Sequence, residues 1–150
     1  MIVDSINNGI VIDHLTAGNG LKVLSLLDIN LKENTVALIM NASSKKYGRK
    51  DLVKIENKMD VDLTALGLID PQATVAYIFN GHIEEKINLS LPKNLINVVK
   101  CKNPRCVTSV EPGVPHIFSL VDEGAGEYRC EYCDELIILK GDWENEMVRR

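Results

Sequence analysis

The chain has 150 residues, of which 45% are apolar and 25% charged, a composition typical of a soluble globular protein. A formal net charge of −4 and an aromatic content of only 5% argue against a general nucleic-acid-binding protein. No apolar run approaches the roughly 20 residues that a transmembrane helix needs. The first residues also lack the pattern of a secretory signal, so we expect a cytoplasmic protein that makes no membrane contact.

Charge and cysteine are distributed unevenly along the chain. Residues 1–100 carry 11 basic and 11 acidic side chains, whereas residues 101–150 carry 6 and 10 and contain all four cysteines. This difference predicts two domains, over 1–93 and 94–150. The second domain, with 57 residues, is small enough to need a metal or a covalent link to hold it folded.

Apolar and β-branched runs predict the elements of the first domain. In chain order they are a strand over 10–14, a helix over 21–27, strands over 36–40 and 51–56, a helix over 62–68, and strands over 73–79 and 82–87. Gly18 and Gly20 end the first strand, and the run 36–40 is apolar enough to be covered on both faces. Asn80-Gly81 predicts a hairpin, because both residues tolerate a positive φ. We therefore expect an α+β domain with one sheet and two helices on one of its faces, in a ferredoxin-like order.

The second domain is expected to begin after Pro92, which lacks a backbone donor and suits a boundary. Short β-branched runs, separated by Pro and Gly, predict a small antiparallel β domain with strands over 107–110, 116–121 and 136–139. Trp143 and the acidic residues Glu144 and Glu146 are interpreted as a solvated end of the chain, with a partner contact as the alternative.

The four cysteines form two close pairs. Cys101 and Cys106 have four residues between them, Cys130 and Cys133 have two, and 23 residues separate the pairs. Two turns that each supply a pair of thiolates make the tetrahedral sulfur site that zinc prefers. Two disulfides are an alternative that the missing secretory signal disfavours, and a redox Cys-x-x-Cys would leave the other pair unexplained. We expect a structural zinc ion that does not catalyse a reaction, because four sulfurs leave no open coordination position.

Polar side chains of the first domain gather on strand faces. Alternation places three residues on one face of the third strand and three on one face of the last strand: Lys50, Leu52 and Lys54, and His82, Glu84 and Lys86. Lysines beside a carboxylate and an apolar wall suit a triphosphate and a ribose. The alternative is that lysines on an edge strand are solvated and discourage aggregation. Asp13 and His14 end the first strand as either a ligand pair or a turn pair, and His82 and His116 are interpreted as surface residues.

Several segments, in this order, resemble the regulatory chain of aspartate carbamoyltransferase. The resemblance covers about residues 3–139 and is most specific in the Gly-Arg-Lys-Asp-Leu block and the cysteine spacing. The matching segments are residues 11–14, 20–26, 48–57, 71–75, 90–92 and 96–98, followed by the four cysteines.

The resemblance implies a non-catalytic subunit with an amino-terminal nucleotide-binding domain and a carboxy-terminal zinc domain. In that family the zinc domain touches the catalytic chain, and the nucleotide domain forms a homodimer of regulatory chains. These dimers join two catalytic trimers into a dodecamer of six catalytic and six regulatory chains. CTP inhibits, UTP reinforces the inhibition and ATP activates, so that pyrimidine biosynthesis follows the nucleotide pools.

The resemblance also assigns nucleotide-binding positions. They comprise base and ribose contacts in the amino-terminal segment, ribose and phosphate ligands on the strands, and apolar neighbours: Val3, Asp4, Ile6, Asp13, His14, Lys50, Leu52, Lys54, Ile78, Ile83 and Lys86. Within this set, Asp13 matches the ribose ligand, and His14 and Lys86 match phosphate ligands. Lys50 and Lys54 match lysines near the ribose, the base and a second nucleotide, whose binding with Mg²⁺ the sequence leaves open.

Three positions depart from the family. Asp4 stands where glutamate is common, Ala76 where well-known members carry asparagine, and Gly81 where they carry a tyrosine near the base. These departures leave phosphate and ribose binding intact and predict a changed base selectivity. Two other functions are alternatives: a nucleic-acid-binding zinc ribbon would need a basic second domain, and an enzyme using Asp13 and His14 would need a further carboxylate or metal cluster.

Overall fold

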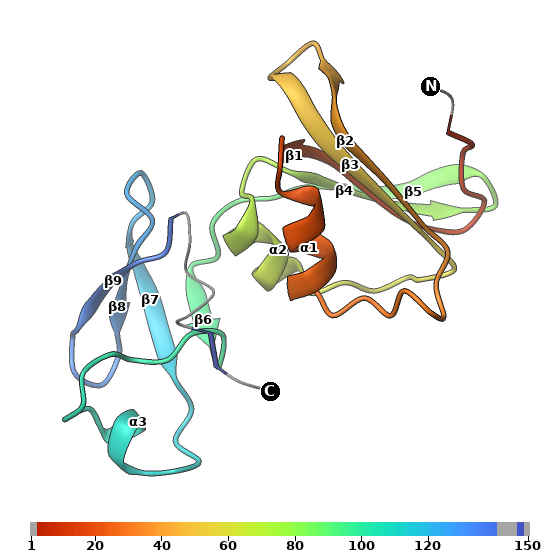
Figure 1. Ribbon diagram of the computed structural model, residues 1–150. Coiled ribbons are helices and arrows are strands. Elements are labelled where there is room, and N and C mark those ends of the chain that lie inside the picture. The colour runs from red at the N-terminus through yellow and green to blue at the C-terminus, as the bar shows by residue number, and fades with distance from the viewer. Residues whose placement is uncertain (1–2, 141–146, 149–150) are drawn as a thin grey trace. The chain divides into compact units, whose positions relative to one another are not determined.

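The computed structural model describes residues 3–140 and 147–148, so the predicted solvated end around Trp143 lies outside the described residues. The chain divides into two compact units, Met1–Ser90 and Leu91–Arg150, which are described separately (Figure 1). None of the helices within the described residues has the length and apolar character that a membrane crossing requires.

The first unit is a five-stranded antiparallel sheet with two helices. Its strands are β1 (Gly9–Thr16), β2 (Val36–Ser44), β3 (Gly48–Glu56), β4 (Thr74–Phe79) and β5 (His82–Asn88), and its helices are α1 (Gly20–Leu26) and α2 (Leu63–Ile69). The strand order is β2-β3-β1-β4-β5, which places β1 at the centre. Both helices lie against one face of the sheet in Figure 1, as the sequence predicted for this α+β unit.

Alternation along the central strands builds the core. Ile10 and Ile12 of β1 are fully buried, as are Val53 and Ile55 of β3 and Val75 of β4, and each lies opposite another of these residues across the ladders. Side chains at the intervening positions face away from the helices, onto what we call the open face of the sheet. The expectation that the second strand is covered on both faces is wrong, because β2 is an edge strand and none of its residues is fully buried.

Two bulges interrupt the ladders on either side of β3. In β1, Asp13 and His14 together lie opposite Leu52, and in β2, Met40 and Asn41 together lie opposite Asp51. His14 and Asn41 both have a positive φ, of 58° each. The predicted end of the first strand at His14 is therefore wrong: the strand continues through the bulge to Thr16.

Asp51 connects these irregular segments from inside the unit. Its carboxylate is fully buried and accepts the backbone N–H groups of Gly18, Gly20 and Asn41, each at 2.8 Å. The three donors belong to the junction before α1 and to the β2 bulge, so a single side chain satisfies backbone groups that neither ladder can satisfy.

The second unit is a four-stranded antiparallel sheet with one short helix. Its elements are β6 (Asn94–Ile96), α3 (Val107–Val110), β7 (Ile117–Asp122), β8 (Glu127–Cys130) and β9 (Leu136–Ile138), and the strand order is β6-β7-β8-β9. Phe118, Tyr128 and Leu95 are almost completely buried in its core. Burial raises the pKa of Tyr128 to about 12, and its hydroxyl donates to the carbonyl oxygen of Pro92 at 2.6 Å.

One predicted strand of this unit is a helix. Residues 107–110 form the single turn α3, because the carbonyl oxygen of Cys106 accepts the Ser109 N–H at 2.9 Å and that of Val107 accepts the Glu111 N–H at 2.8 Å. Pro112 then prevents further helical bonds. The strands β6 and β8 were not predicted, and β8 shows why: only four residues, Glu127–Cys130, carry the alternation.

Candidate functional site

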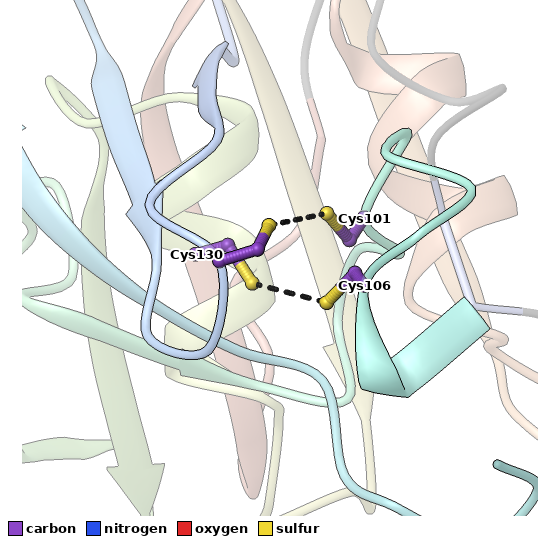
Figure 2. Close-up of side chains that lie close together, drawn as sticks. Cys101, Cys106 and Cys130 are labelled. Atoms are coloured by element: carbon purple, nitrogen blue, oxygen red, sulfur yellow. Dashed lines mark hydrogen bonds between the residues drawn. The ribbon is translucent and has the colours of Figure 1, made fainter. Parts of the chain in front are cut away.

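The four cysteines come together in the second unit. Their sulfur atoms all lie within 4.8 Å of one another, with 3.5 Å between Cys101 and Cys133 and 3.8 Å between Cys106 and Cys130. Figure 2 shows Cys101 and Cys106 facing Cys130 across the site. A zinc–sulfur distance of about 2.3 Å gives a tetrahedron edge of about 3.8 Å, so the four sulfurs fit a tetrahedral metal ion.

Tight turns position the two pairs of cysteines. The Cys106 N–H donates to the carbonyl oxygen of Asn103 at 3.1 Å, which folds the segment after Cys101 back toward the site. The Cys130 N–H donates to the backbone carbonyl oxygen of Glu135 at 2.8 Å, and the Cys130 carbonyl oxygen accepts the backbone N–H of Asp134 at 3.0 Å. These backbone hydrogen bonds shape the turns that carry the two pairs of cysteines.

The pKa values of the cysteine thiols indicate that a cation is needed to stabilise their thiolate forms. Burial raises the pKa of Cys101 to about 12 and also raises that of Cys130. Burial acts in the same direction on Cys106, but hydrogen bonds from the side chain and backbone of Thr108 outweigh it and lower the pKa to about 7. Four adjacent thiolates need a positive charge among them, and a divalent metal ion provides it.

His116 is partly exposed, and it has a hydrogen-bond partner next to this cluster that the sequence did not indicate. Its Nδ1 accepts the backbone N–H of Cys101 at 3.4 Å, and its own N–H donates to the Asn97 side chain at 2.9 Å. No spacing in the sequence indicated this contact, because it depends on the approach of β6 to the segment before β7.

The open face of the first unit brings most of the predicted nucleotide-binding residues together. The β pairings align one row across five strands: Ala37, Lys54, Val11, Ala76 and Lys86. The bulge residues Asp13 and His14 lie one row further along, next to Thr74. Strands about 4.8 Å apart place the two lysines of the first row on either side of a central apolar strip.

The amino-terminal segment crosses this face and borders two hollows. One hollow of about 350 Å³ is lined by open-face residues and by the segment: Ser5, Ile6, Val11, Asp13, Leu52, Lys54, Ile78, Gly81 and Ile83. The other, of about 460 Å³, is lined by Val3, Asp4, Ser5, Ile6, Thr35, Ala37, Lys54 and Glu56. Lys54 lines both, and its Nζ donates to the carbonyl oxygen of Asp4 at 3.3 Å, which ties the segment to β3.

Asp13 lines the first hollow, and His14, which lines neither hollow, lies next to Asp13 in the bulge. One oxygen of Asp13 forms an ion pair with Lys50 at 2.8 Å and also accepts the His14 N–H at 2.6 Å. The Nδ1 of His14 lies 3.0 Å from the hydroxyl of Thr74. Because of the bulge, two consecutive side chains reach the open face where a regular strand would present only one.

Lys86 and Gly81 lie at the β4–β5 side of this face. Lys86 is exposed and, within the described residues, does not line either hollow, although it shares a row with Lys54. Gly81 has φ +79°, its N–H donates to the Asn7 carbonyl oxygen at 2.8 Å, and a Cβ atom built on it would lie 3.4 Å from the Asn7 side chain. A larger residue at position 81 would therefore be strained.

A ligand-sized hollow on a sheet and a four-cysteine cluster that suits a structural metal are features of a ligand-binding protein. Comparison with known families agrees with this class. The family model for the aspartate carbamoyltransferase regulatory chain allosteric domain matches residues 1–90, and the model for its metal-binding domain matches residues 93–140. The chain belongs to the aspartate carbamoyltransferase regulatory chain family, whose members are non-catalytic subunits.

Individual relatives support the same membership. Regulatory chains of aspartate carbamoyltransferase from Clostridium botulinum and Clostridium acetobutylicum are each 55% identical over 136 residues, which cover 91% of this chain and 93% of the relative. The regulatory chain from Bifidobacterium longum is 52% identical over 135 residues, or 90% of this chain and 97% of that relative.

Proposed function

We propose that the open face of the first unit binds nucleoside triphosphates and that this binding regulates the catalytic chain of aspartate carbamoyltransferase. The observation that carries the proposal is the hollow of about 350 Å³ with Lys54 and Asp13 at its walls. A hollow of this size suits a small-molecule ligand, an amino group suits phosphate, and a carboxylate accepts from ribose hydroxyls. CTP, UTP and ATP are the proposed effectors, through which the chain controls pyrimidine biosynthesis.

The bound nucleotide is proposed to lie along the row from Lys54 to Lys86. The base and ribose occupy the apolar side formed by Ile6, Leu52 and Ile78, with Asp13 on the ribose. The phosphates extend toward His14 and Lys86. This orientation places negative charge next to the cationic groups of the open face.

Base selectivity is proposed to be low in this chain. Gly81 lies in the lining of the hollow and has no side chain to meet the base, and Ala76 lies between Val11 and Lys86 in the same row. The lysines recognise phosphate, which all nucleoside triphosphates share. CTP and ATP should therefore bind with similar affinity. A second nucleotide with Mg²⁺ is proposed for the hollow of about 460 Å³ on the other side of the amino-terminal segment.

The second unit is proposed to hold one zinc ion and to contact the catalytic chain. Four thiolates favour a soft or borderline metal, and tetrahedral geometry favours zinc among them. When bound, the ion supplies folding free energy and no chemistry of its own. Family membership supports the remaining proposals: a cytoplasmic location, a domain boundary near residue 93, a homodimer through the first unit, and a dodecamer of six regulatory and six catalytic chains.

Lys86→Ala should weaken CTP and ATP binding by the same factor, roughly tenfold, because the lost contact is a charged one to phosphate. Isothermal titration of both nucleotides into wild type and variant measures the two affinities. Lys93→Ala removes an exposed lysine from the second unit and serves as the matched control, with both affinities unchanged.

Two results would contradict this expectation. Unchanged affinities in Lys86→Ala would place the phosphates elsewhere on the chain. A wild type that binds CTP but not ATP would show that residues other than the one at position 81 select the base.

A further inference from the structure

His14 has a backbone conformation that needs support. Its φ of 58° lies in the left-handed region, which is unfavourable for a residue that carries a Cβ atom. Residues that flank it are buried on the other side of the sheet, since Ile12 and Leu15 are both fully buried. The left-handed turn is therefore what separates the imidazole from the core and directs it to the open face.

The segment between α2 and β4 supplies that support. The Gln72 amide donates from Nε2 to the carbonyl oxygen of His14 at 3.2 Å. Two residues later in β1, Thr16 donates its backbone N–H and its hydroxyl to the two carboxylate oxygens of Asp70, at 2.5 Å and 3.2 Å. The Asn19 amide donates to the same carboxylate at 3.2 Å.

Asp70 is itself held firmly in place. Its side chain is only 2% exposed. Its backbone N–H donates to the carbonyl oxygen of Leu66 in α2 at 2.9 Å, as the last bond of that helix. The helix thus fixes a carboxylate that holds the chain just after His14, while Gln72 holds the His14 peptide itself. Within the described residues, neither Asp70 nor Gln72 lines either hollow, so any effect on a ligand there must pass through another residue.

We propose that Gln72 and Asp70 are positioning residues for His14, holding the left-handed turn that presents its imidazole to the phosphates of the nucleotide. The inference rests on the proposed binding of nucleoside triphosphates to the open face. Gln72 is half-buried, so its loss disturbs the turn more than the fold. Asp70 supports both the turn at His14 and the fold of the first unit, because its carboxylate is buried.

The test is a double-mutant cycle on the full chain with its metal bound. Gln72→Leu keeps the approximate volume and removes the amide donor, and His14→Ala removes the imidazole. CTP affinity is measured for wild type, both single variants and the double variant. Gln72→Leu should weaken CTP binding about three- to tenfold in the wild-type background and have no effect in the His14→Ala background, because its contribution acts through the missing ring.

Nuclear magnetic resonance of the imidazole nitrogens provides a readout without any nucleotide. The chain has only three histidines, and His14→Ala identifies the signal of His14 by its disappearance. Gln72→Leu should shift or broaden that signal. Lys140→Met is the matched control: its side chain also donates to a backbone carbonyl, that of Gly124 at 3.0 Å, but it lies in the second unit and should leave the His14 signal unchanged.

The two measurements separate the possible failures. An unchanged His14 signal in Gln72→Leu, or equal weakening of CTP in both backgrounds, overturns the positioning role. A wild type that binds neither CTP nor ATP overturns the proposed function, and the imidazole signals then still decide whether Gln72 positions His14. Asp70→Asn should change the His14 signal in the same direction as Gln72→Leu and also lower the stability of the first unit.

Discussion

Removal of the metal is expected to unfold the second unit and to leave the first unit folded. Metal binding contributes on the order of 10 kcal/mol in small zinc modules, which exceeds what a four-stranded sheet with a small core supplies. Strands β6–β9 bury few large side chains, chiefly Phe118, Tyr128 and Leu95. Cys130→Ser, or treatment with a mercurial and a chelator, should therefore abolish protection of this sheet and, under the proposed function, release the catalytic chain.

Amide hydrogen exchange with elemental analysis for zinc checks this expectation. Exchange should become fast throughout β6–β9 in Cys130→Ser, while β1 and β3 of the first unit keep their protection. Val110→Ala changes a side chain that is 63% exposed in the same unit and should retain both the metal and the protection. A fully protected second unit that contains no metal would contradict the role of the ion.

Lowering the pH should also favour release of the metal ion from the second unit. Burial raises the pKa of Cys101 to about 12, so its thiol is protonated at neutral pH in the absence of a metal and must release a proton when the ion binds. Apparent metal affinity therefore falls as the pH falls. Competition with a chromogenic chelator between pH 8 and pH 6 measures this slope, and a pH-independent affinity would show that the ligands are already deprotonated.

Replacement of Asp51 by alanine is expected to destabilise the first unit by about 4 kcal/mol. The variant leaves the N–H groups of Gly18, Gly20 and Asn41 without their acceptor, and of these three bonds the one from Gly20 is fully buried and the other two are partly buried. Each unsatisfied buried donor costs about 1–3 kcal/mol, and whole domains are stable by only about 5–15 kcal/mol. The loss should fall on the β2 bulge and on the junction before α1.

Urea unfolding of the metal-loaded chain, followed by exchange of β1 and β3 amides, measures this free energy. Asp51→Asn should lose about half as much, because an amide offers one acceptor oxygen and places its own donors against the remaining N–H groups. Asp62→Ala is the control for a capping carboxylate: Asp62 accepts the Ala65 N–H at the start of α2 at 3.1 Å, and its loss should cost about 1 kcal/mol. Equal costs for Asp51→Ala and Asp62→Ala would contradict the special role of Asp51.

The sequence predicted the elements of the first unit because its local signals agree with its tertiary contacts. Ile10 and Ile12 alternate, and Asn80-Gly81 forms the turn that the sequence indicated, with both residues at positive φ. The signals failed where backbone geometry is irregular or elements are very short. A bulge has no composition of its own, so the continuation of β1 beyond His14 was missed, and Val107–Val110 has β-branched residues but follows a turn that continues as a helix.

In the candidate site, too, residues with a local sequence signal were predicted and residues that depend on distant contacts were not. Cysteine spacing sufficed to predict the metal cluster, because two short turns constrain all four sulfur positions. Asp51, Asp70 and Gln72 were not predicted, since they act on backbone groups between 10 and 58 residues away in sequence and no short motif describes such contacts. His116 was missed for the same reason.

The bulge in β1 also restricts how this gene can change in length. Buried positions Ile10, Ile12 and Leu15 are spaced by two and then by three residues, because Asp13 and His14 together occupy the bulge. A one-codon deletion there would give a regular spacing of two, keep Leu15 on the core face and remove one of the two side chains that reach the open face. Deletions should therefore be absent from this point in homologues that use both open-face side chains, even though ordinary substitutions of the exposed neighbours are tolerated.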